Sequence, residues 1–288
     1  VAEPDASLLN EADKWILSRV NRLAKDVTEN MDKFELGIAV QKVYDFIWDE
    51  FCDWYVETAK YRIYHKEEEK AAADCVLWVL KTVLKQALKL LHPFMPFITE
   101  EIYSVLVPEE ESLMMSEWPQ FHAEWDFPAE ENVMEHVKEI TRGIRNMRAE
   151  MNVPNNRKTK VYVVCEDTEI CDGISTLENS IKPLMMAEKI LVQQTKENIA
   201  DNAVSVVVPD AVVYLPLEDL VDFEQEMERL QKEEEKLKKE IKRAEGMLSN
   251  ERFISKAPEA KVQEEREKLE KYTQMLQQVQ ERMAGLKK

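Results

Sequence analysis

The chain from Glu218 to Lys288 repeats its apolar residues with a rhythm that few folds can accommodate. Seam positions recur there at alternating spacings of four and three, in two runs separated by residues 249–258. This spacing predicts two coiled-coil helices of about 30 residues, each about 45 Å long. Because the break is short, we predict that the helices fold back on each other as an antiparallel hairpin. The predicted seam consists of Phe223, Met227, Leu230, Glu234, Leu237, Ile241, Ala244 and Leu248, followed by Val262, Arg266, Leu269, Thr273, Leu276, Gln280 and Met283.

The first half of the chain has the period of packed α-helices. Apolar residues recur at spacings of three, four and seven from about Ser7 to Met151, which predicts a helical bundle. Pro93 and Pro96 interrupt one apolar run, so we predict a corner between two helices within Leu91–Tyr103. The side chains of this corner that are available for the core are Phe94, Met95, Phe97 and Ile98.

A segment with period two lies between these regions. Thr159–Cys165 alternates, and two valine-rich runs flank Pro209 to Ala211, which predicts strands that end in a hairpin. A helix over Ile174–Lys182 would complete a small α/β module of about four strands. The predicted fold class is therefore mainly α, with a helical bundle over residues 1–157, a small α/β module over 158–217 and an antiparallel coiled-coil hairpin over 218–288.

The net charge of −18 disfavours nucleic-acid binding when it is averaged over the 288 residues. A phosphate backbone, however, meets the local field of the surface that it touches. Residues 100–135 hold eleven acidic and no basic residues, whereas residues 229–288 hold 16 basic and 12 acidic ones. The C-terminal segment therefore remains a candidate for contact with a polyanion.

Cysteine and histidine spacing predicts no metal site. The four cysteines have no CxxC spacing and the four histidines form no i, i+4 pair, so we expect reduced and mostly buried thiols. No apolar run approaches the roughly 20 residues of a membrane span, and the first residues lack a signal pattern. We therefore expect a soluble cytoplasmic protein without a membrane partner.

Three groups of residues are candidates for RNA contact. Arginines at i, i+3 and i+6 share one side of a predicted helix, where they could bind phosphate or pair with acids of the bundle. Aromatic residues beside cations in residues 50–62 suit unpaired bases, although we expect Phe51 and Tyr55 to be core. A basic stripe within about 80° of arc lies opposite the hairpin seam; it could follow phosphates or be a solvated face. These candidates are Arg142, Arg145 and Arg148, then Trp54, Lys60 and Arg62, then Arg229, Lys232, Lys236, Lys239 and Arg243.

Several of these segments resemble the valyl-tRNA synthetases. LHPFMPFITEEIY at 91–103 is similar to the anticodon-binding helical domain of the class I synthetases for valine, isoleucine and leucine. Three further segments, at 50–62, 144–154 and 252–269, are similar to the valine enzymes, and the last adds Arg252 at the turn of the arm to the candidates. The isoleucine enzymes typically end in cysteine-rich zinc modules and the leucine enzymes lack this hairpin, so the valine family fits best.

The resemblance implies a C-terminal piece of a larger enzyme. The parent would join valine to its tRNA with ATP and edit mischarged threonine, but this chain has no HIGH-like or KMSKS-like signature. We therefore expect an inactive, monomeric tRNA-binding region without a cofactor, with the tRNA and the catalytic and editing domains of the parent as its partners. One alternative is a structural protein whose arm packs against protein partners, and another is the hairpin of an ATP-driven translation factor.

Overall fold

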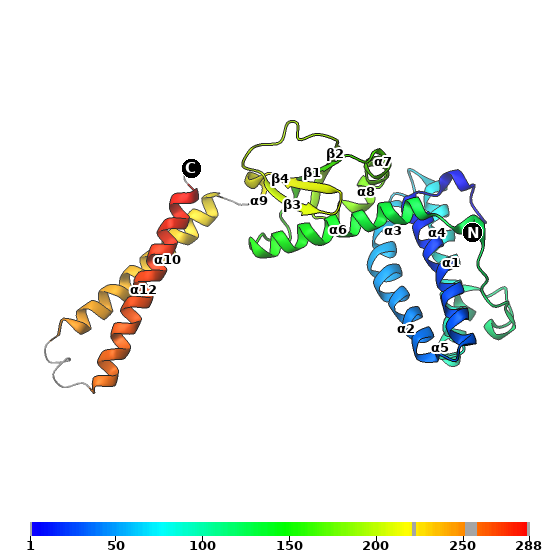
Figure 1. The fold of residues 1–288 in the computed structure, drawn as a ribbon, viewed down its shortest axis with the longest axis horizontal. Coiled ribbons are helices and arrows are strands. Elements are labelled where there is room, and N and C mark those ends of the chain that lie inside the picture. The colour runs from blue at the N-terminus through cyan, green and yellow to red at the C-terminus, as the bar shows by residue number, and fades with distance from the viewer. Residues whose placement is uncertain (1, 221–222, 251–257, 287–288) are drawn as a thin grey trace. The chain divides into compact units, whose positions relative to one another are not determined.

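The computed structural model describes residues 2–220, 223–250 and 258–286. The chain forms two compact units, one up to Leu217 and one from Glu218 onward (Figure 1). Helices dominate both, which confirms the predicted fold class. The first unit contains the helices α1 (Glu11–Asp32), α2 (Leu36–Asp45), α3 (Glu57–Tyr64), α4 (Lys70–Leu91), α5 (Pro96–Leu106), α6 (Pro128–Glu150), α7 (Thr168–Thr176) and α8 (Glu178–Ile181), the π-helix η2 (Phe46–Val56), and the short 3-10 helices η1 (Ala6–Leu8), η3 (Leu113–Met115) and η4 (Ala123–Trp125).

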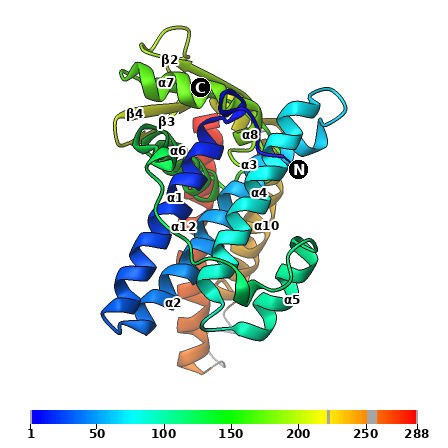
Figure 2. The same ribbon diagram turned by 90° about the vertical axis from the view of Figure 1, so that its right-hand side faces the viewer.

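Helix α1 begins at a capping box and buries one face. The side chain of Asn10 accepts a hydrogen bond from the backbone N–H of Asp13 at 3.0 Å, and Asp13 accepts one from the N–H of Asn10 at 3.1 Å. Helices α1, α2 and α4 run side by side, as Figures 1 and 2 show, and α6 also packs on α1. The buried apolar face of α1 includes Trp15, Ile16, Val20, Leu23 and Val27.

The proline corner is confirmed, but its apolar residues do not enter the core. Helix α4 ends at Leu91 and α5 begins at Pro96. Thr99 and Tyr103, one turn apart, are the fully buried residues of α5, so the opposite side of this short helix faces outward. Phe97 is 91% exposed, and Met95 and Ile98 are about half exposed.

The π-helix η2 continues α2 with a wider turn. Because its hydrogen bonds join residues five apart, Phe46 and Phe51 share a face, and both are buried. Trp54 and Tyr55 are buried one turn further on. The expected core positions of Phe51 and Tyr55 are therefore confirmed.

A connector over residues 107–127 crosses the bundle and is tied to helices on its way. Glu110 accepts hydrogen bonds from Lys85 and Tyr103. Further along, the indole N–H of Trp118 donates to the hydroxyl of Thr28 at 2.8 Å. These bonds hold the connector against α4, α5 and α1.

The predicted strands form one mixed sheet in the order β2-β1-β4-β3. β1 pairs with β2 in parallel and with β4 in antiparallel, while β3 and β4 form the predicted hairpin around Pro209 and Asp210. Asp210 has a φ of 56°, a conformation that Asp tolerates in tight turns. The strands are β1 (Thr159–Cys165), β2 (Ala187–Gln193), β3 (Val204–Val208) and β4 (Ala211–Leu215).

Helix α6 is shared between the bundle and the sheet. One part of it packs on α1, and other parts pack on α7 and β3. At Gly143 a Cβ atom would meet Val206 Cγ1 at 2.7 Å, so the absence of a side chain allows the close approach to β3. The bundle and the module thus belong to one compact unit, and their division at residue 157 into separate domains stays a prediction.

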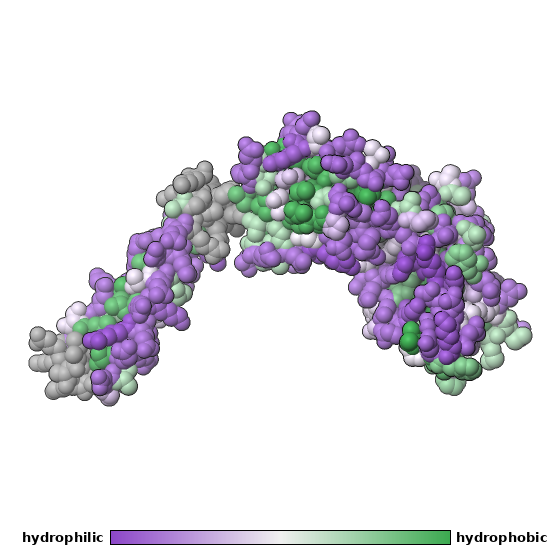
Figure 3. Space-filling model, in the orientation of Figure 1, coloured by the Kyte–Doolittle hydropathy of each residue, from purple (hydrophilic) through white to green (hydrophobic). Residues whose placement is uncertain are grey.

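The second unit contains α9 (Leu217–Leu220, which begins at the boundary) and the long helices α10 (Phe223–Leu248) and α12 (Glu259–Leu286). The long helices pack along their length, and Gln280 Nε2 donates to Glu234 Oε1 at 2.9 Å across the pair. Leu230, Leu237 and Val279 are the buried centre of the seam. Hydrophilic residues cover most of the visible face of this arm (Figure 3).

The predicted seam of the second arm helix is wrong at alternate positions. Tyr272 and Val279 pack into the seam, whereas the predicted Thr273 and Gln280 are exposed. The apolar residues on α12 follow spacings of three then four from Leu269, and not four then three. Both phases share Leu269, Leu276 and Met283, so the spacing of these three residues did not distinguish them.

Candidate nucleic-acid interface

Arg62, predicted to hold RNA, is buried in the bundle. Its Nη1 lies 2.5 Å from Asp13 Oδ2, and its Nη2 donates to the carbonyl of Leu8 at 3.3 Å. Tyr55 Oη donates to the other Asp13 oxygen at 2.7 Å, and burial, followed by the Asp13 charge, raises the pKa of Tyr55 well above its usual value. The prediction for Arg62 is therefore wrong, because its charge is neutralised inside the fold.

Two more predicted contacts turn inward. Trp54 is only 8% exposed, so it offers no ring face to a base. Arg148 is 2% exposed, and its Nη2 donates to the carbonyls of Pro154 at 2.9 Å and Arg157 at 2.6 Å. Burial lowers the pKa of the Arg148 guanidinium. Arg148 therefore stabilises the turn after α6 and does not face a surface that RNA could contact.

Among the remaining predicted cations of the first unit, Arg142 and Arg145 are exposed and Lys60 is partly buried, and each has a partner. Arg142 lies 2.7 Å from Glu139 and 3.8 Å from Glu135. Arg145 donates from Nε to the carbonyl of Leu184 at 3.1 Å. Lys60 lies 2.5 Å from Glu57, and this hydrogen bond raises the pKa of Lys60. The arginine row of α6 thus splits into one buried and two exposed side chains, and does not form a single surface.

The basic stripe of the arm is presented to solvent on α10. All five predicted residues between 229 and 243 are exposed. Lys232 pairs with Glu228 at 2.6 Å and Arg243 lies 3.6 Å from Glu240, while Arg229 also has a partner. Lys236 and Lys239 make no ion pair within the described ranges. Arg252 lies outside the described residues.

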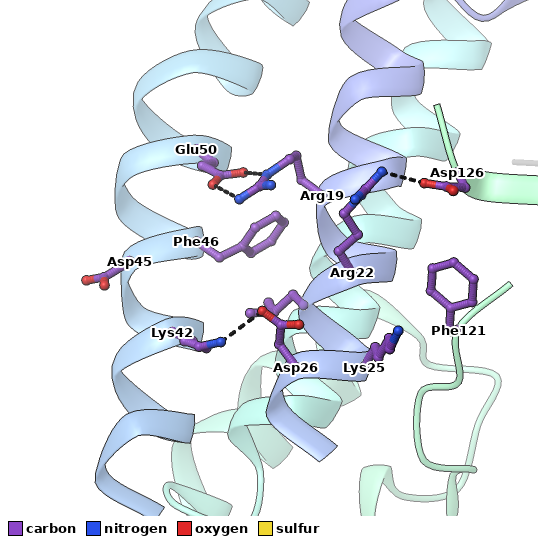
Figure 4. Close-up of a pocket in the computed structure, with 11 residues that line it drawn as sticks. Arg19, Arg22, Lys25, Asp26, Lys42, Asp45, Phe46, Glu50, Phe121 and Asp126 are labelled. Atoms are coloured by element: carbon purple, nitrogen blue, oxygen red, sulfur yellow. Dashed lines mark hydrogen bonds and ion pairs between the residues drawn. The ribbon is translucent and has the colours of Figure 1, made fainter. Parts of the chain in front are cut away.

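A pocket between α1 and α2, which sequence reasoning missed, gathers further cations (Figure 4). Its volume is about 620 Å³. Arg19, Arg22 and Lys25 reach it from α1 at i, i+3 and i+6, the same spacing that singled out the arginines of α6. Lys42 reaches it from α2. This spacing of cations is visible in the sequence, so these residues could have been predicted as candidates.

Carboxylates balance most of these charges. Arg19 donates from Nε and Nη2 to the two oxygens of Glu50, both at 2.7 Å, and these hydrogen bonds raise its pKa. Arg22 lies 2.6 Å from Asp126, and Lys42 lies 2.8 Å from Asp26.

One corner of the pocket has a different chemistry. Lys25 Nζ lies over the ring of Phe121 at 5.9 Å from its centroid, and Phe121 is partly exposed. No carboxylate is paired with Lys25 among the described residues. This corner therefore offers a cation and an aromatic ring together.

An exposed aromatic pair lies on the α2–η2 helix. Tyr44 and Trp48 are 56% and 53% exposed, and their ring centroids are 6.3 Å apart. They stand four residues apart on the solvent side, whereas the predicted Trp54 lies in the core. An aromatic i, i+4 pair on a polar helix face was the signal that could have identified them, since exposed rings suit base stacking.

No metal cluster and no membrane-crossing helix occur within the part of the chain that the structure describes. Groups of three or more His, Cys, Asp or Glu side chains that could hold a metal ion are absent there. No helix among those residues is both long and apolar enough to cross a bilayer.

Two family models match the chain. The model described as the anticodon-binding domain of tRNA ligase matches residues 13–163, and the one described as the valyl tRNA synthetase tRNA binding arm matches residues 222–287.

Similar proteins include several bacterial valine-tRNA ligases. That of Clostridium perfringens is 50% identical over 275 residues, which are 96% of this chain and 31% of that protein. Those of Clostridium tetani and Bacillus subtilis are 48% and 39% identical, over 98% and 96% of this chain and 32% and 31% of their own lengths. The chain thus spans about a third of the curated relatives that it matches.

Proposed function

We propose that this chain, which belongs to the family of tRNA-ligase anticodon-binding domains and carries the tRNA-binding arm of valyl-tRNA synthetases, holds one tRNA at two places. The bundle would bind the anticodon stem and loop, and the arm would bind the outer corner where the D and T loops meet. Holding the RNA at two places restricts the movement of its acceptor end, which lowers the entropic cost of a reaction there.

The observation that carries the proposal for the arm is its pair of unneutralised lysines. Lys236 and Lys239 are exposed on α10 and have no acidic partner among the described residues. Lys232 is paired only with an exposed glutamate, and surface pairs of this kind are worth about 0–1 kcal/mol, so a phosphate can replace the glutamate at little cost. Such contacts are independent of sequence and depend on salt.

On the bundle, exposed rings and exchangeable cations support anticodon binding. Tyr44 and Trp48 offer ring faces on which unpaired bases can stack. The pocket between α1 and α2 supplies Arg19 and Arg22, which would exchange carboxylate partners for phosphate, and Lys25, which needs no exchange. Hydrogen bonds to the edges of the stacked bases would provide discrimination between tRNAs, and phosphate contacts would provide most of the affinity.

The relatives, which are about three times as long as this chain, are named valine-tRNA ligases. We propose that a protein containing this chain joins valine to a valine-specific tRNA with ATP, through catalytic and editing domains formed by other residues. A monomeric state and a cytoplasmic location stay predictions.

The arm is tested by measuring tRNA binding at several salt concentrations. The double variant Lys236→Glu/Lys239→Glu should bind all tRNAs more weakly, and the slope of log K against log salt should shrink by about 1 per lost phosphate contact. The control Lys238→Glu/Lys242→Glu changes the net charge equally on the same helix but outside the stripe. If both double variants lose the same affinity, the stripe is not the contact surface, and if neither loses any, the arm does not bind RNA.

The bundle is tested with Trp48→Ala. We expect it to weaken binding of valine tRNA by about 1–3 kcal/mol, because one stack between a base and the ring is lost. Phe97→Ala removes an even more exposed ring, 91% exposed, from α5 and serves as the control. An unchanged affinity for Trp48→Ala, or an equal loss for both variants, contradicts the stacking role.

A further inference from the structure

Two cysteines of the α/β module lie side by side although they are six positions apart in the sequence. Cys165 is the last residue of β1 and Cys171 lies in the first half of α7. Their sulfur atoms are 2.9 Å apart, and the two residues are 2% and 8% exposed. The strand–turn–helix path brings them together, which the absence of a CxxC spacing did not reveal.

The backbone fixes both cysteines on either side of the turn. Asp167 caps α7 by accepting hydrogen bonds from the N–H groups of Glu169 and Ile170, at 2.9 and 3.3 Å. The N–H of Cys171 donates to the carbonyl of Asp167 at 3.0 Å. Because Cys165 is paired with Ala211 of β4, it is fixed as well. The short distance between the sulfurs is therefore a property of the local fold.

A disulfide between these sulfurs needs little movement. An S–S bond is about 2.05 Å long, so the sulfurs must approach by less than about 1 Å. Apart from the other sulfur, each thiol is near a backbone carbonyl, to which it donates weakly: Cys165 Sγ lies 3.2 Å from the carbonyl of Asp167, and Cys171 Sγ lies 3.2 Å from the carbonyl of Cys165. No charged partner needs to be displaced from either sulfur.

We propose that Cys165 and Cys171 are an oxidation site, at which a peroxide converts the two thiols into a reversible intrachain disulfide. One thiol attacks the peroxide oxygen, which gives a sulfenic acid and one water; the other thiol then attacks that sulfur and releases a second water. The two thiols lose two electrons and two protons in total, and hydrogen peroxide is reduced to two molecules of water.

A pocket beside Cys165 would be the route by which a small oxidant approaches the pair. Cys165 lines an open pocket of about 640 Å³, together with Asp167 and Asp210. Burial and then the hydrogen bond with Cys165 raise the pKa of Cys171 to about 12, so its reactive thiolate is scarce at neutral pH. Cys171 therefore rests as a thiol, and formation of the disulfide needs an added oxidant.

The disulfide would tie the end of β1 to α7. Gly173 of α7 packs closely on Val133 of α6, since a Cβ atom on this glycine would meet Val133 Cγ2 at 2.7 Å. Oxidation would thus stiffen the part of the module that contacts the shared helix. Slower amide exchange over residues 165–171 of the oxidised protein is the expected sign.

The test treats the full chain with hydrogen peroxide, alkylates the remaining thiols after denaturation and analyses the tryptic peptide of residues 161–189. Both cysteines of this peptide should escape alkylation, and dithiothreitol should restore two alkyl groups. Counting alkyl groups avoids interference from oxidation of Met185 and Met186 in the same peptide. Cys52 and Cys75, which have no cysteine partner, serve as internal controls and should still react with the alkylating agent after peroxide treatment.

The outcomes are distinct. Alkylation of both cysteines after peroxide, their conversion to sulfinic or sulfonic acids, or a link between two molecules on a non-reducing gel would overturn the proposal. Cys171→Ser should leave Cys165 as a sulfenic acid that dimedone labels. The unsubstituted protein gives a result even if this variant fails to fold.

Discussion

Replacement of Asp13 by alanine tests the buried ion pair that removed Arg62 from the candidate interface. The change leaves the Arg62 guanidinium buried without its counter-charge and takes the acceptor from Tyr55 Oη. It also breaks the capping box at the start of α1, because Asp13 accepts from the N–H of Asn10. Every one of these losses destabilises the folded bundle.

The expected loss in the free energy of unfolding follows from the removal of one partner of a buried ion pair. Such a loss typically costs about 3–5 kcal/mol, because a charge is left uncompensated in a medium of low polarity. We therefore expect Asp13→Ala to lower the free energy of unfolding of the first unit by about 4 kcal/mol, and its Tm by about 10 °C. That is a large fraction of the about 5–15 kcal/mol of a typical domain.

Urea unfolding followed by tryptophan fluorescence measures this cost, since Trp15 lies buried on the same helix. Asp26→Ala is the matched control, because it removes an aspartate from α1 whose pair with Lys42 is 2.8 Å long but half exposed. This surface pair should contribute about 0–1 kcal/mol. Equal losses for the two variants would refute the reasoning and show that water already screens the Arg62 pair. The double change Asp13→Leu/Arg62→Met should recover much of the stability, since it removes both charges.

Three further predictions use matched pairs of positions. Gly173→Ala should lower the stability of the first unit by about 1–3 kcal/mol, because its methyl group would overlap Val133, whereas Gly37→Ala, with nothing within 4 Å, should raise it by about 0.4–1 kcal/mol; thermal unfolding measures both. Val279→Ala should destabilise the arm by up to about 1.6 kcal/mol, at about 0.8 kcal/mol per buried CH₂, while the exposed Thr273→Ala changes it by less than about 0.5 kcal/mol in circular-dichroism melts. Hydrogen bonds from Lys85 and then Tyr103 lower the pKa of Glu110 in the folded protein. The stabilisation that ionised Glu110 gives to the fold is therefore complete above the pKa of an unfolded glutamate, about 4.3, and is lost as the pH falls through the lower pKa of the folded state. Hydrogen exchange of the Glu110 amide, corrected for its intrinsic pH dependence, should lose protection over that interval, and Glu110→Gln should not show the change.

Apolar periodicity, prolines and turn residues were enough to predict the strands of the hairpin and the long helices. The single helix predicted over Ile174–Lys182 is wrong, because α7 (Thr168–Thr176) and α8 (Glu178–Ile181) occupy this region. Thr159–Cys165 is the strand that alternation indicated, Pro96 begins α5, and the hairpin turn lies at Pro209 and Asp210. These features depend on local rules, namely the two-residue period of strands, the missing N–H of proline and the turn conformations that Asp tolerates. Local rules act between residues that are near in the sequence, so the sequence itself contains them.

Tertiary packing alone decided which charged and aromatic side chains face solvent. Arg62 pairs in the interior with Asp13, 49 positions earlier, and Trp54 packs in the core whereas Trp48 stays exposed. The choice of Tyr272 over Thr273 in the seam, by contrast, could have been made from the sequence, because Tyr272 and Val279 are apolar and Thr273 and Gln280 are polar. A helical period gives the relative directions of side chains but not the absolute direction of the core, which is defined only when distant segments pack together.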